Sequence, residues 1–213
     1  LVANRVIQQK KYPIINYAVE HTDKPTIVLN EHLKLVSQIN WQYKIAIKLS
    51  SFGFDEDIVN TLIGHCLRKN IRVIIDAEEG SLNDEYQEIS NYLQKQHNRY
   101  VPYVIKTYQM YRKDSLKTLE QDILDSHIND YYLGIKLVRG AYHNTEYKEG
   151  HLFTNKKDTD DNYNKGLLTI YNNNAKLYTM LATHNTDSIR LGYLSNVEAR
   201  KPIFEFAHLM GMR

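Results

Sequence analysis

The feature that most constrains the fold is a regular alternation of short apolar runs with helix-length amphipathic segments. The runs begin near positions 45, 73, 103, 134, 178 and 203. They are brief and rich in β-branched residues, which is typical of buried parallel strands. The intervals of 28, 30, 31, 44 and 25 residues leave room for a helix between consecutive strands. Repeated β/α units of this kind predict a parallel sheet covered by helices.

The segments between the runs carry apolar stripes at helical spacing. In residues 54–69, for example, Ile58, Leu62 and Cys66 fall on one face. Asp55 or Ser51 is placed to cap the start of this helix, and Asp114 to cap a later one. The other expected helices cover residues 83–97, 115–129, 163–176 and 186–195, and the longest interval holds an insertion at 140–161.

Two architectures share this order of elements: an open doubly wound sheet and a (β/α)8 barrel. No Gly-x-Gly-x-x-Gly follows the first run, which disfavours a dinucleotide-binding Rossmann unit. A barrel typically takes about 250 residues, and this chain has 213. We therefore predict an α/β fold of the TIM-barrel type with about six of the eight β/α units present. It would form one partial domain over 1–213, with a helical lead-in at 1–40 and barrel units at 41–213.

Composition excludes several classes of protein. There are 27 basic and 25 acidic residues, a net charge of +2, so no electrostatic signature of nucleic-acid binding is present. Cys66 is the single cysteine, which excludes a disulfide framework and a multi-cysteine zinc site, and we expect no metal. No run approaches the roughly 20 apolar residues of a membrane span. The chain begins at Leu1, so a targeting peptide would lie upstream.

Polar side chains gather at the expected strand ends, where the chemistry of β/α barrels takes place. A ring around one pocket would comprise Lys48, Asp76, Lys106, Lys136, Arg139 and His184. Its excess positive charge suits an anionic ligand such as a phosphate, a carboxylate or a reduced flavin. Singly, these residues have simpler explanations. Lys48 and Asp76 could form a structural ion pair, Gly140 a turn, and His184 or Asn185 a loop or helix cap.

The strand-end segments, taken together, resemble the proline dehydrogenase family. They are Ile47-Lys48-Leu49-Ser50, Asp76-Ala77-Glu78-Glu79, Thr107-Tyr108-Gln109, Lys136-Leu137-Val138-Arg139-Gly140-Ala141-Tyr142, Ala182-Thr183-His184-Asn185 and Phe206 to Met212. They occur in the order that the family has, and the resemblance extends from about Ile15 to the end of the chain.

The resemblance implies a distorted (β/α)8 barrel that holds FAD non-covalently. Such enzymes oxidise L-proline to Δ1-pyrroline-5-carboxylate and pass the electrons to a quinone. The implied catalytic residues are Lys48, Asp76 and Lys136, and the implied proline contacts are Lys48, Asp76 and Leu209. The implied FAD contacts are Ala77, Lys106, Arg139, Gly140, Ala141, Tyr142, Thr183, His184 and Asn185. Fixed cations would stabilise the negative charge that hydride transfer places on a flavin.

The resemblance also implies a location: the matrix side of the mitochondrial inner membrane in a eukaryotic host, otherwise the cytoplasm or a peripheral place on its membrane. Two departures from the family pattern stand out. Lys106 replaces an uncharged polar residue, and the Arg-Arg pair that binds the proline carboxylate in the family's last units does not occur in this sequence. The alternatives are a truncated, non-catalytic barrel remnant or interaction module, and a flavin barrel for another substrate, such as a folate reductase.

Overall fold

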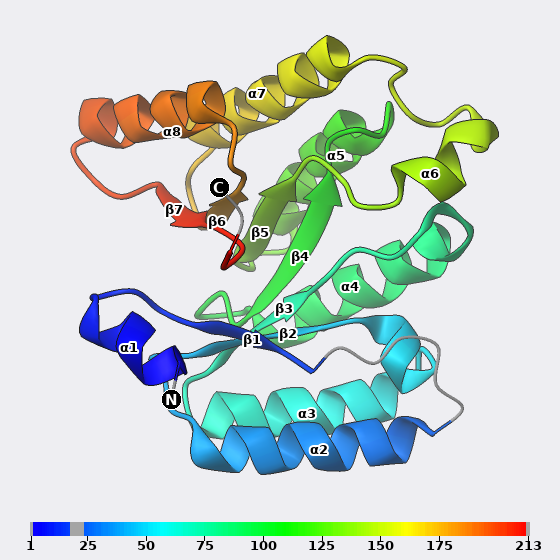
Figure 1. Ribbon diagram of the computed structural model, residues 1–213, viewed down its shortest axis with the longest axis vertical. Coiled ribbons are helices and arrows are strands. Elements are labelled where there is room, and N and C mark those ends of the chain that lie inside the picture. Colours follow the sequence, from blue (N-terminus) through cyan, green and yellow to red (C-terminus); the bar gives the residue numbers. More distant parts are fainter. Residues whose placement is uncertain (1, 18–23, 212–213) are drawn as a thin grey trace.

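A single parallel sheet organises the chain, for which a computed structural model describes residues 2–17 and 24–211. Its seven strands are β1 (Ile14–Asn16), β2 (Lys44–Ile47), β3 (Arg72–Ile75), β4 (Val104–Gln109), β5 (Leu133–Val138), β6 (Leu177–Ala182) and β7 (Phe204–Ala207). They pair in chain order, each parallel to the next. The sheet curls, and long helices cover its outer face (Figure 1). The predicted partial TIM-type barrel is confirmed.

The helices follow the strands as the sequence predicts. They are α1 (Val2–Gln8), α2 (Pro25–Gln38), α3 (Glu56–Arg68), α4 (Asn83–His97), α5 (Ser115–Ile128), α6 (His143–Glu146), α7 (Lys156–Asn172) and α8 (Thr186–Ala199). Short 3-10 turns occur at η1 (Leu49–Phe52), η2 (Gly80–Leu82) and η3 (Tyr147–Glu149). Within the described ranges, no helix combines the length and apolarity that crossing a bilayer requires.

Strand β1 is a correction to the expected helical lead-in at 1–40. Its three residues lie beside β2, with Ile15 in register with Ile45, so the described sheet has seven strands rather than six. A segment this short has no period that a sequence pattern can reveal. Ile14 and Ile15 favour a strand locally, and pairing with the buried β2 fixes one there.

Helix ends explain why the helices start where they do. Asp55 accepts a hydrogen bond from the Ile58 amide at 3.0 Å, which confirms it as the cap of α3. Asp114 stands at the N-cap of α5 but makes no capping hydrogen bond. Its carboxylate lies 3.3 Å from Arg112 instead. Helix α7 begins at Lys156 rather than Tyr163, because Asn155 caps it by accepting from the Asp158 amide.

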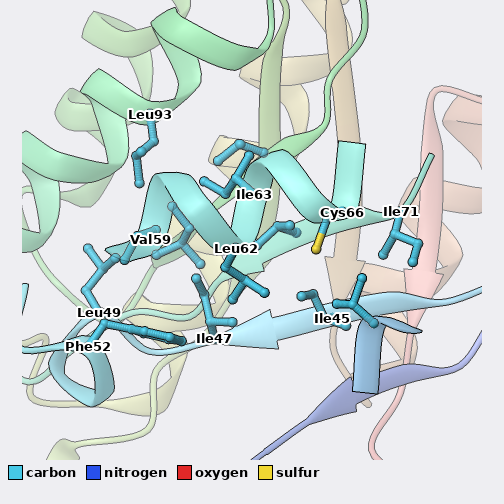
Figure 2. Packing of buried hydrophobic residues seen from close by; sticks show 14 of the residues in the cluster. Ile45, Ile47, Leu49, Phe52, Val59, Leu62, Ile63, Cys66, Ile71 and Leu93 are labelled. Carbon is cyan, nitrogen blue, oxygen red and sulfur yellow. The ribbon is translucent and has the colours of Figure 1, made fainter. Parts of the chain in front are cut away.

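The two faces of the sheet have different neighbours. On the outer face, Ile45 and Ile47 of β2 pack against Leu62 and Cys66 of α3, all fully buried (Figure 2). The smaller inner cluster consists of side chains from β2, β3, β4 and β6, namely Ala46, Ile74, Ile105 and Met180. Since side chains alternate along a strand, this cluster identifies the positions of each strand that face the barrel interior.

Candidate functional site

An ion pair between β3 and β5 lies at the carboxyl-terminal edge of the sheet. Asp76 directly follows β3, and its Oδ1 lies 2.5 Å from Nζ of Lys136 on β5. Both side chains are about one-fifth exposed, at 20% and 17%. The sequence led us to expect Lys48 as the partner of Asp76. Among the described residues, Lys136 occupies that place, because its position on β5 faces the interior.

Tyr142 connects the ends of three strands. Its hydroxyl accepts a hydrogen bond from Lys48 Nζ at 2.5 Å and donates to the Ala77 carbonyl oxygen at 3.2 Å. The ammonium also lies 5.0 Å from the centre of the Tyr142 ring, within the range of a cation–π interaction. Residues that follow β2, β3 and β5 are therefore joined through one phenol.

The turn that carries Gly140 and Ala141 rests on the end of β4. Gly140 has φ +146°, and a Cβ there would lie 2.4 Å from ring carbons of Tyr111. The Ala141 amide donates to Gln109 Oε1 at 3.2 Å, and Gln109 in turn donates to the Glu78 carbonyl at 3.1 Å. The close backbone approach at Gly140 is thus to a tyrosine ring of the chain itself.

Arg139 is held by three partners. Its Nε donates to Asp160 at 2.6 Å, and its two terminal nitrogens donate to Thr183 at 2.6 Å and Ser188 at 3.0 Å. Its guanidinium also stacks on Tyr163, 4.5 Å from the ring centre. Burial raises the pKa of Asp160, but hydrogen bonds from Lys156 and Arg139 outweigh it and lower that pKa overall. Contacts with the described residues use three of the five guanidinium N–H donors, and the other two could serve a ligand.

The residues of the Ala-Thr-His-Asn segment, 182–185, have different surroundings. Thr183 is buried against Arg139, as above. Asn185 caps α8 by accepting from the Ser188 amide at 3.0 Å, the simpler of its two sequence interpretations. His184 is exposed, accepts from the Leu209 amide at 3.3 Å, and lies 5.0 Å from the His208 ring. Leu209 is 68% exposed, and Met212 lies outside the described residues.

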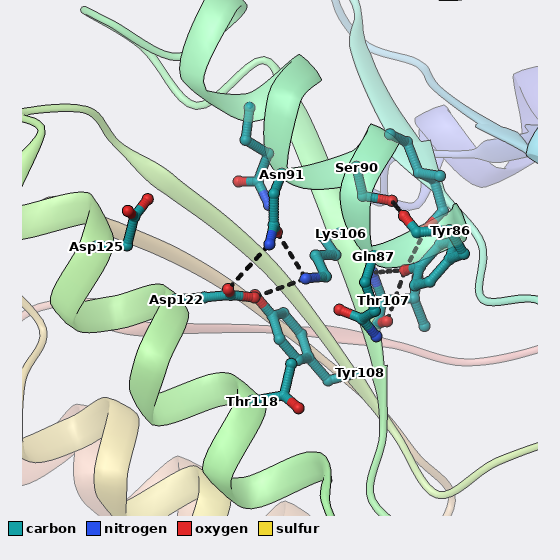
Figure 3. Close-up of polar contacts among 12 residues, drawn as sticks. Tyr86, Gln87, Ser90, Asn91, Lys106, Thr107, Tyr108, Thr118, Asp122 and Asp125 are labelled. Atoms are coloured by element: carbon teal, nitrogen blue, oxygen red, sulfur yellow. Dashed lines mark hydrogen bonds and ion pairs between the residues drawn. The ribbon is translucent and has the colours of Figure 1, made fainter. Parts of the chain in front are cut away.

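Lys106 does not join this group, which corrects its predicted place in the pocket. Its side chain is fully buried on the outer face of β4, where Nζ donates to Asn91 at 2.7 Å and to Asp122 at 2.6 Å (Figure 3). Burial lowers its pKa, and the charge of Asp122 acts in the opposite direction. The reason is strand alternation: Ile105 faces the interior, so its neighbour faces the helices.

Four residues at this edge were missed from the sequence, namely Tyr111, Glu146, Asp160 and Ser188. Gln109 belongs to one of the segments that carry the family resemblance, but no role was assigned to it; it lies two residues after Thr107 and so faces the same side. Glu146 and Asp160 belong to the polar insertion at 140–161, whose composition is typical of a solvated loop. Yet Glu146 is only 1% exposed, so burial of that insertion is a tertiary effect.

The charges at this edge favour an anionic ligand. Three cations, Lys48, Lys136 and Arg139, lie at this edge with two carboxylates, Asp76 paired with Lys136 and Asp160 paired with Arg139. The start of α8, capped beside Thr183, adds the partial positive charge of a helix N-terminus. A dinucleotide with a pyrophosphate and a ring that becomes anionic on reduction fits this donor set. The two uncommitted N–H groups of Arg139 support that fit.

Known proteins resemble this chain in sequence. A family model described as proline dehydrogenase matches residues 7–213. The probable mitochondrial proline dehydrogenase of Schizosaccharomyces pombe is 27% identical over 98% of this chain and 44% of its own length. The mitochondrial proline dehydrogenase 2 of Arabidopsis thaliana is 31% identical over 69% of this chain and 34% of its own length.

A solved structure shares the fold. Proline utilization A from Bdellovibrio bacteriovorus, inactivated by N-propargylglycine, superposes with a TM-score of 0.89 at 17% identity. The match covers 99% of this chain and 27% of that one. This chain thus spans less than half the length of the relatives named here.

Proposed function

Since the chain belongs to the proline dehydrogenase family, we propose that the protein oxidises L-proline to Δ1-pyrroline-5-carboxylate with FAD as cofactor and a quinone as electron acceptor. The observation that carries the proposal is the Lys136–Asp76 pair at the carboxyl ends of β3 and β5, with Lys48 and Arg139 at the same edge. Barrel enzymes place their chemistry at this edge.

The proposed substrate matches the charges on the Lys48 side of the site. L-proline carries a carboxylate and a secondary ammonium. Lys48 would attract the carboxylate, and Asp76 would orient the ammonium. Tyr142 fixes Lys48 through the 2.5 Å hydrogen bond, which limits the positions that the ammonium of Lys48 can take. Leu209 would contact the apolar carbons of the ring.

On the other side of the site, Arg139 and Lys136 would hold FAD. Bound FAD supplies the acceptor for the hydride that leaves proline. Arg139, oriented by Thr183 and Asp160, would direct its two remaining N–H donors to anionic groups of the cofactor. Lys136, fixed by Asp76, places a second positive charge where negative charge accumulates during the reaction. Ala77, Gly140, Ala141, Tyr142, His184 and Asn185 would complete the cofactor contacts.

The proposal extends to location by analogy with the relatives. Proteins similar to this chain are mitochondrial in Dictyostelium discoideum, S. pombe and A. thaliana. In a eukaryotic host we propose the matrix side of the inner mitochondrial membrane, with peripheral association that brings the site to the quinone. In a bacterial host the corresponding place is the cytoplasm or its membrane surface.

The decisive experiment is an absorbance spectrum of the purified protein before and after anaerobic addition of L-proline. A flavin band that bleaches supports the proposal. A protein without a flavin band, or with a band that proline leaves unchanged, contradicts it and favours the non-catalytic interpretation. D-proline, which reverses the configuration at the reacting carbon, is the matched substrate control.

Two substitutions separate the cofactor side from the substrate side. Arg139→Ala removes the donors directed at FAD, so we expect flavin content to fall more than proline affinity. Asp76→Ala should leave flavin bound and lower turnover by about tenfold or more, because Lys136 loses its partner and proline its anchor. Exposed Arg68→Ala and Asp84→Ala are the matched controls. Full flavin content in Arg139→Ala, or undiminished turnover in Asp76→Ala, would refute the respective role.

A further inference from the structure

A buried carboxylate lies behind the candidate site. Glu146, at the end of the short helix α6, is 1% exposed. Its Oε2 accepts a 2.5 Å hydrogen bond from the Tyr111 hydroxyl and lies 3.6 Å from Nη1 of Arg112. Burial and the neighbouring carboxylate raise the pKa of Tyr111, so its hydroxyl stays protonated and continues to donate. A buried carboxylate with so few partners is costly unless its position serves the rest of the molecule.

Tyr111, which binds Glu146, also contacts the turn that follows β5. Its ring lies flat against Gly140, where even a Cβ would find no room. Its hydroxyl accepts from the Tyr142 amide at 3.3 Å, and its own amide donates to the Arg139 carbonyl at 2.7 Å. One tyrosine therefore contacts the backbone of three of the four residues from 139 to 142.

Tyr142 then reaches the substrate side of the site. Its hydroxyl is the group that joins Lys48 to the Ala77 carbonyl. The path from the buried carboxylate to the Lys48 ammonium thus consists of three hydrogen bonds between adjacent partners: Glu146 to Tyr111, Tyr111 to Tyr142, and Tyr142 to Lys48.

The insertion that carries Glu146 is itself anchored to the segment that follows β4. Leu152 forms an antiparallel bridge with Arg112, and the Phe153 amide donates to the Tyr111 carbonyl at 2.9 Å. The insertion also packs against the segment that follows β3: a Cβ on Gly80 would lie 2.5 Å from a carboxylate oxygen of Glu149. Glu146 is held in place from both sides, which a positioning group requires.

We propose that Glu146 is a positioning residue that acts through Tyr111 to fix Tyr142, and thereby the ammonium of Lys48 that meets the substrate carboxylate. The inference rests on the proposed oxidation of proline and adds to it a residue that touches neither substrate nor cofactor. Its consequence is specific: removing Glu146 should weaken proline use only while the Tyr142 hydroxyl is present.

A double-mutant cycle on the flavin-loaded protein tests this dependence. In the wild-type background, Glu146→Ala should lower kcat/KM for L-proline about tenfold, through KM more than kcat, with flavin content unchanged. In the Tyr142→Phe background the same change should lower it less than about twofold. Equal losses in both backgrounds would show a general structural effect and overturn the proposal. Tyr111→Phe, which keeps the ring under Gly140, replaces Glu146→Ala in the cycle if that variant does not fold.

Hydrogen exchange gives a readout that needs no turnover. Exchange of the Tyr142 amide should accelerate about tenfold in Tyr111→Phe, because its acceptor is lost. Tyr147→Phe, a matched loss of a hydroxyl at a half-exposed position of the same insertion, should leave it unchanged. Unaltered exchange in Tyr111→Phe would overturn the proposal. Accelerated exchange in a protein that does not oxidise proline would instead refute the proposed function while supporting this arrangement.

Discussion

At the scale of single residues, Gly140 meets two independent requirements. Its φ of +146° lies in a region that residues with a side chain rarely adopt, and the Tyr111 ring fills the space where a Cβ would lie. The ring cannot retreat freely, because its hydroxyl is bound to Glu146. Glycine is therefore needed here for the backbone conformation and for the packing at once.

We predict that Gly140→Ala destabilises the protein by about 3 kcal/mol, the sum of backbone strain and overpacking, and reduces its flavin content. Thermal or denaturant unfolding and the flavin-to-protein absorbance ratio are the measurements. Gly150→Ala is the control, because Gly150 has φ +74° but open space around it, and its cost should be about 1 kcal/mol. Equal losses at the two positions would mean that contact with Tyr111 is unimportant.

The lysines show which part of the site could be predicted residue by residue. Lys48 lies two residues after the inward Ala46, and Lys136 is in register with Thr107, so both face the interior at the predicted edge. Arg139, one residue past β5, has the opposite parity and contacts Asp160 of α7 and Ser188 of α8. Lys106 also has the outward parity, since it is one residue away from the inward Ile105 and Thr107. The sequence contains that information, but the inward parity must be known for at least one residue of the strand before it can be used.

At the scale of elements, a buried polar network joins β4 to α4 and α5. Asp122 of α5 accepts from Lys106 at 2.6 Å and from the Tyr108 hydroxyl at 2.7 Å, and Asn91 of α4 completes the group (Figure 3). Such a pair seldom stabilises more than apolar packing would, yet removing one partner leaves a buried charge without compensation.

We predict that Asp122→Ala lowers the free energy of unfolding by about 3 to 5 kcal/mol, whereas the double variant Lys106→Met/Asp122→Leu recovers most of that loss. Urea unfolding of the two variants is the measurement. The control is Lys95→Met, which breaks the exposed pair with Asp125 between the same two helices and should cost about 0.5 kcal/mol. A double variant as unstable as the single one would show that the network provides more than charge compensation.

Element boundaries differ in how far local signals specify them. The cap at Asp55 is a local signal, and α3 starts after it. The start of α7 has the same kind of local signal, a cap at Asn155, which was overlooked because the insertion around it looked irregular. Strand β1 instead depends on pairing with β2, a tertiary contact that a one-dimensional pattern records weakly.

At the scale of the whole molecule, the concave face has a polar contact that joins distant strands. Lys44 of β2 donates to Glu205 of β7 at 3.1 Å, across 161 residues of sequence. Tyr178 of β6 donates to the same carboxylate at 2.5 Å, and the Arg72 guanidinium lies 4.3 Å from the centre of the Tyr178 ring. The contact connects the second and the last described strands, so it can form only after the sheet has curled.

This order of events has a kinetic consequence. Contacts that require closure of a long loop form late, and weakening a late contact accelerates unfolding without slowing folding. We predict that Glu205→Gln raises the unfolding rate about threefold and leaves the refolding rate within about twofold, a modest effect because the Glu205 side chain is 43% exposed. Stopped-flow unfolding and refolding in urea measure both rates. Glu31→Gln, which breaks an exposed pair within α2, should change neither rate appreciably. Slower refolding of Glu205→Gln with an unchanged unfolding rate would place the curling of the sheet before the rate-limiting step.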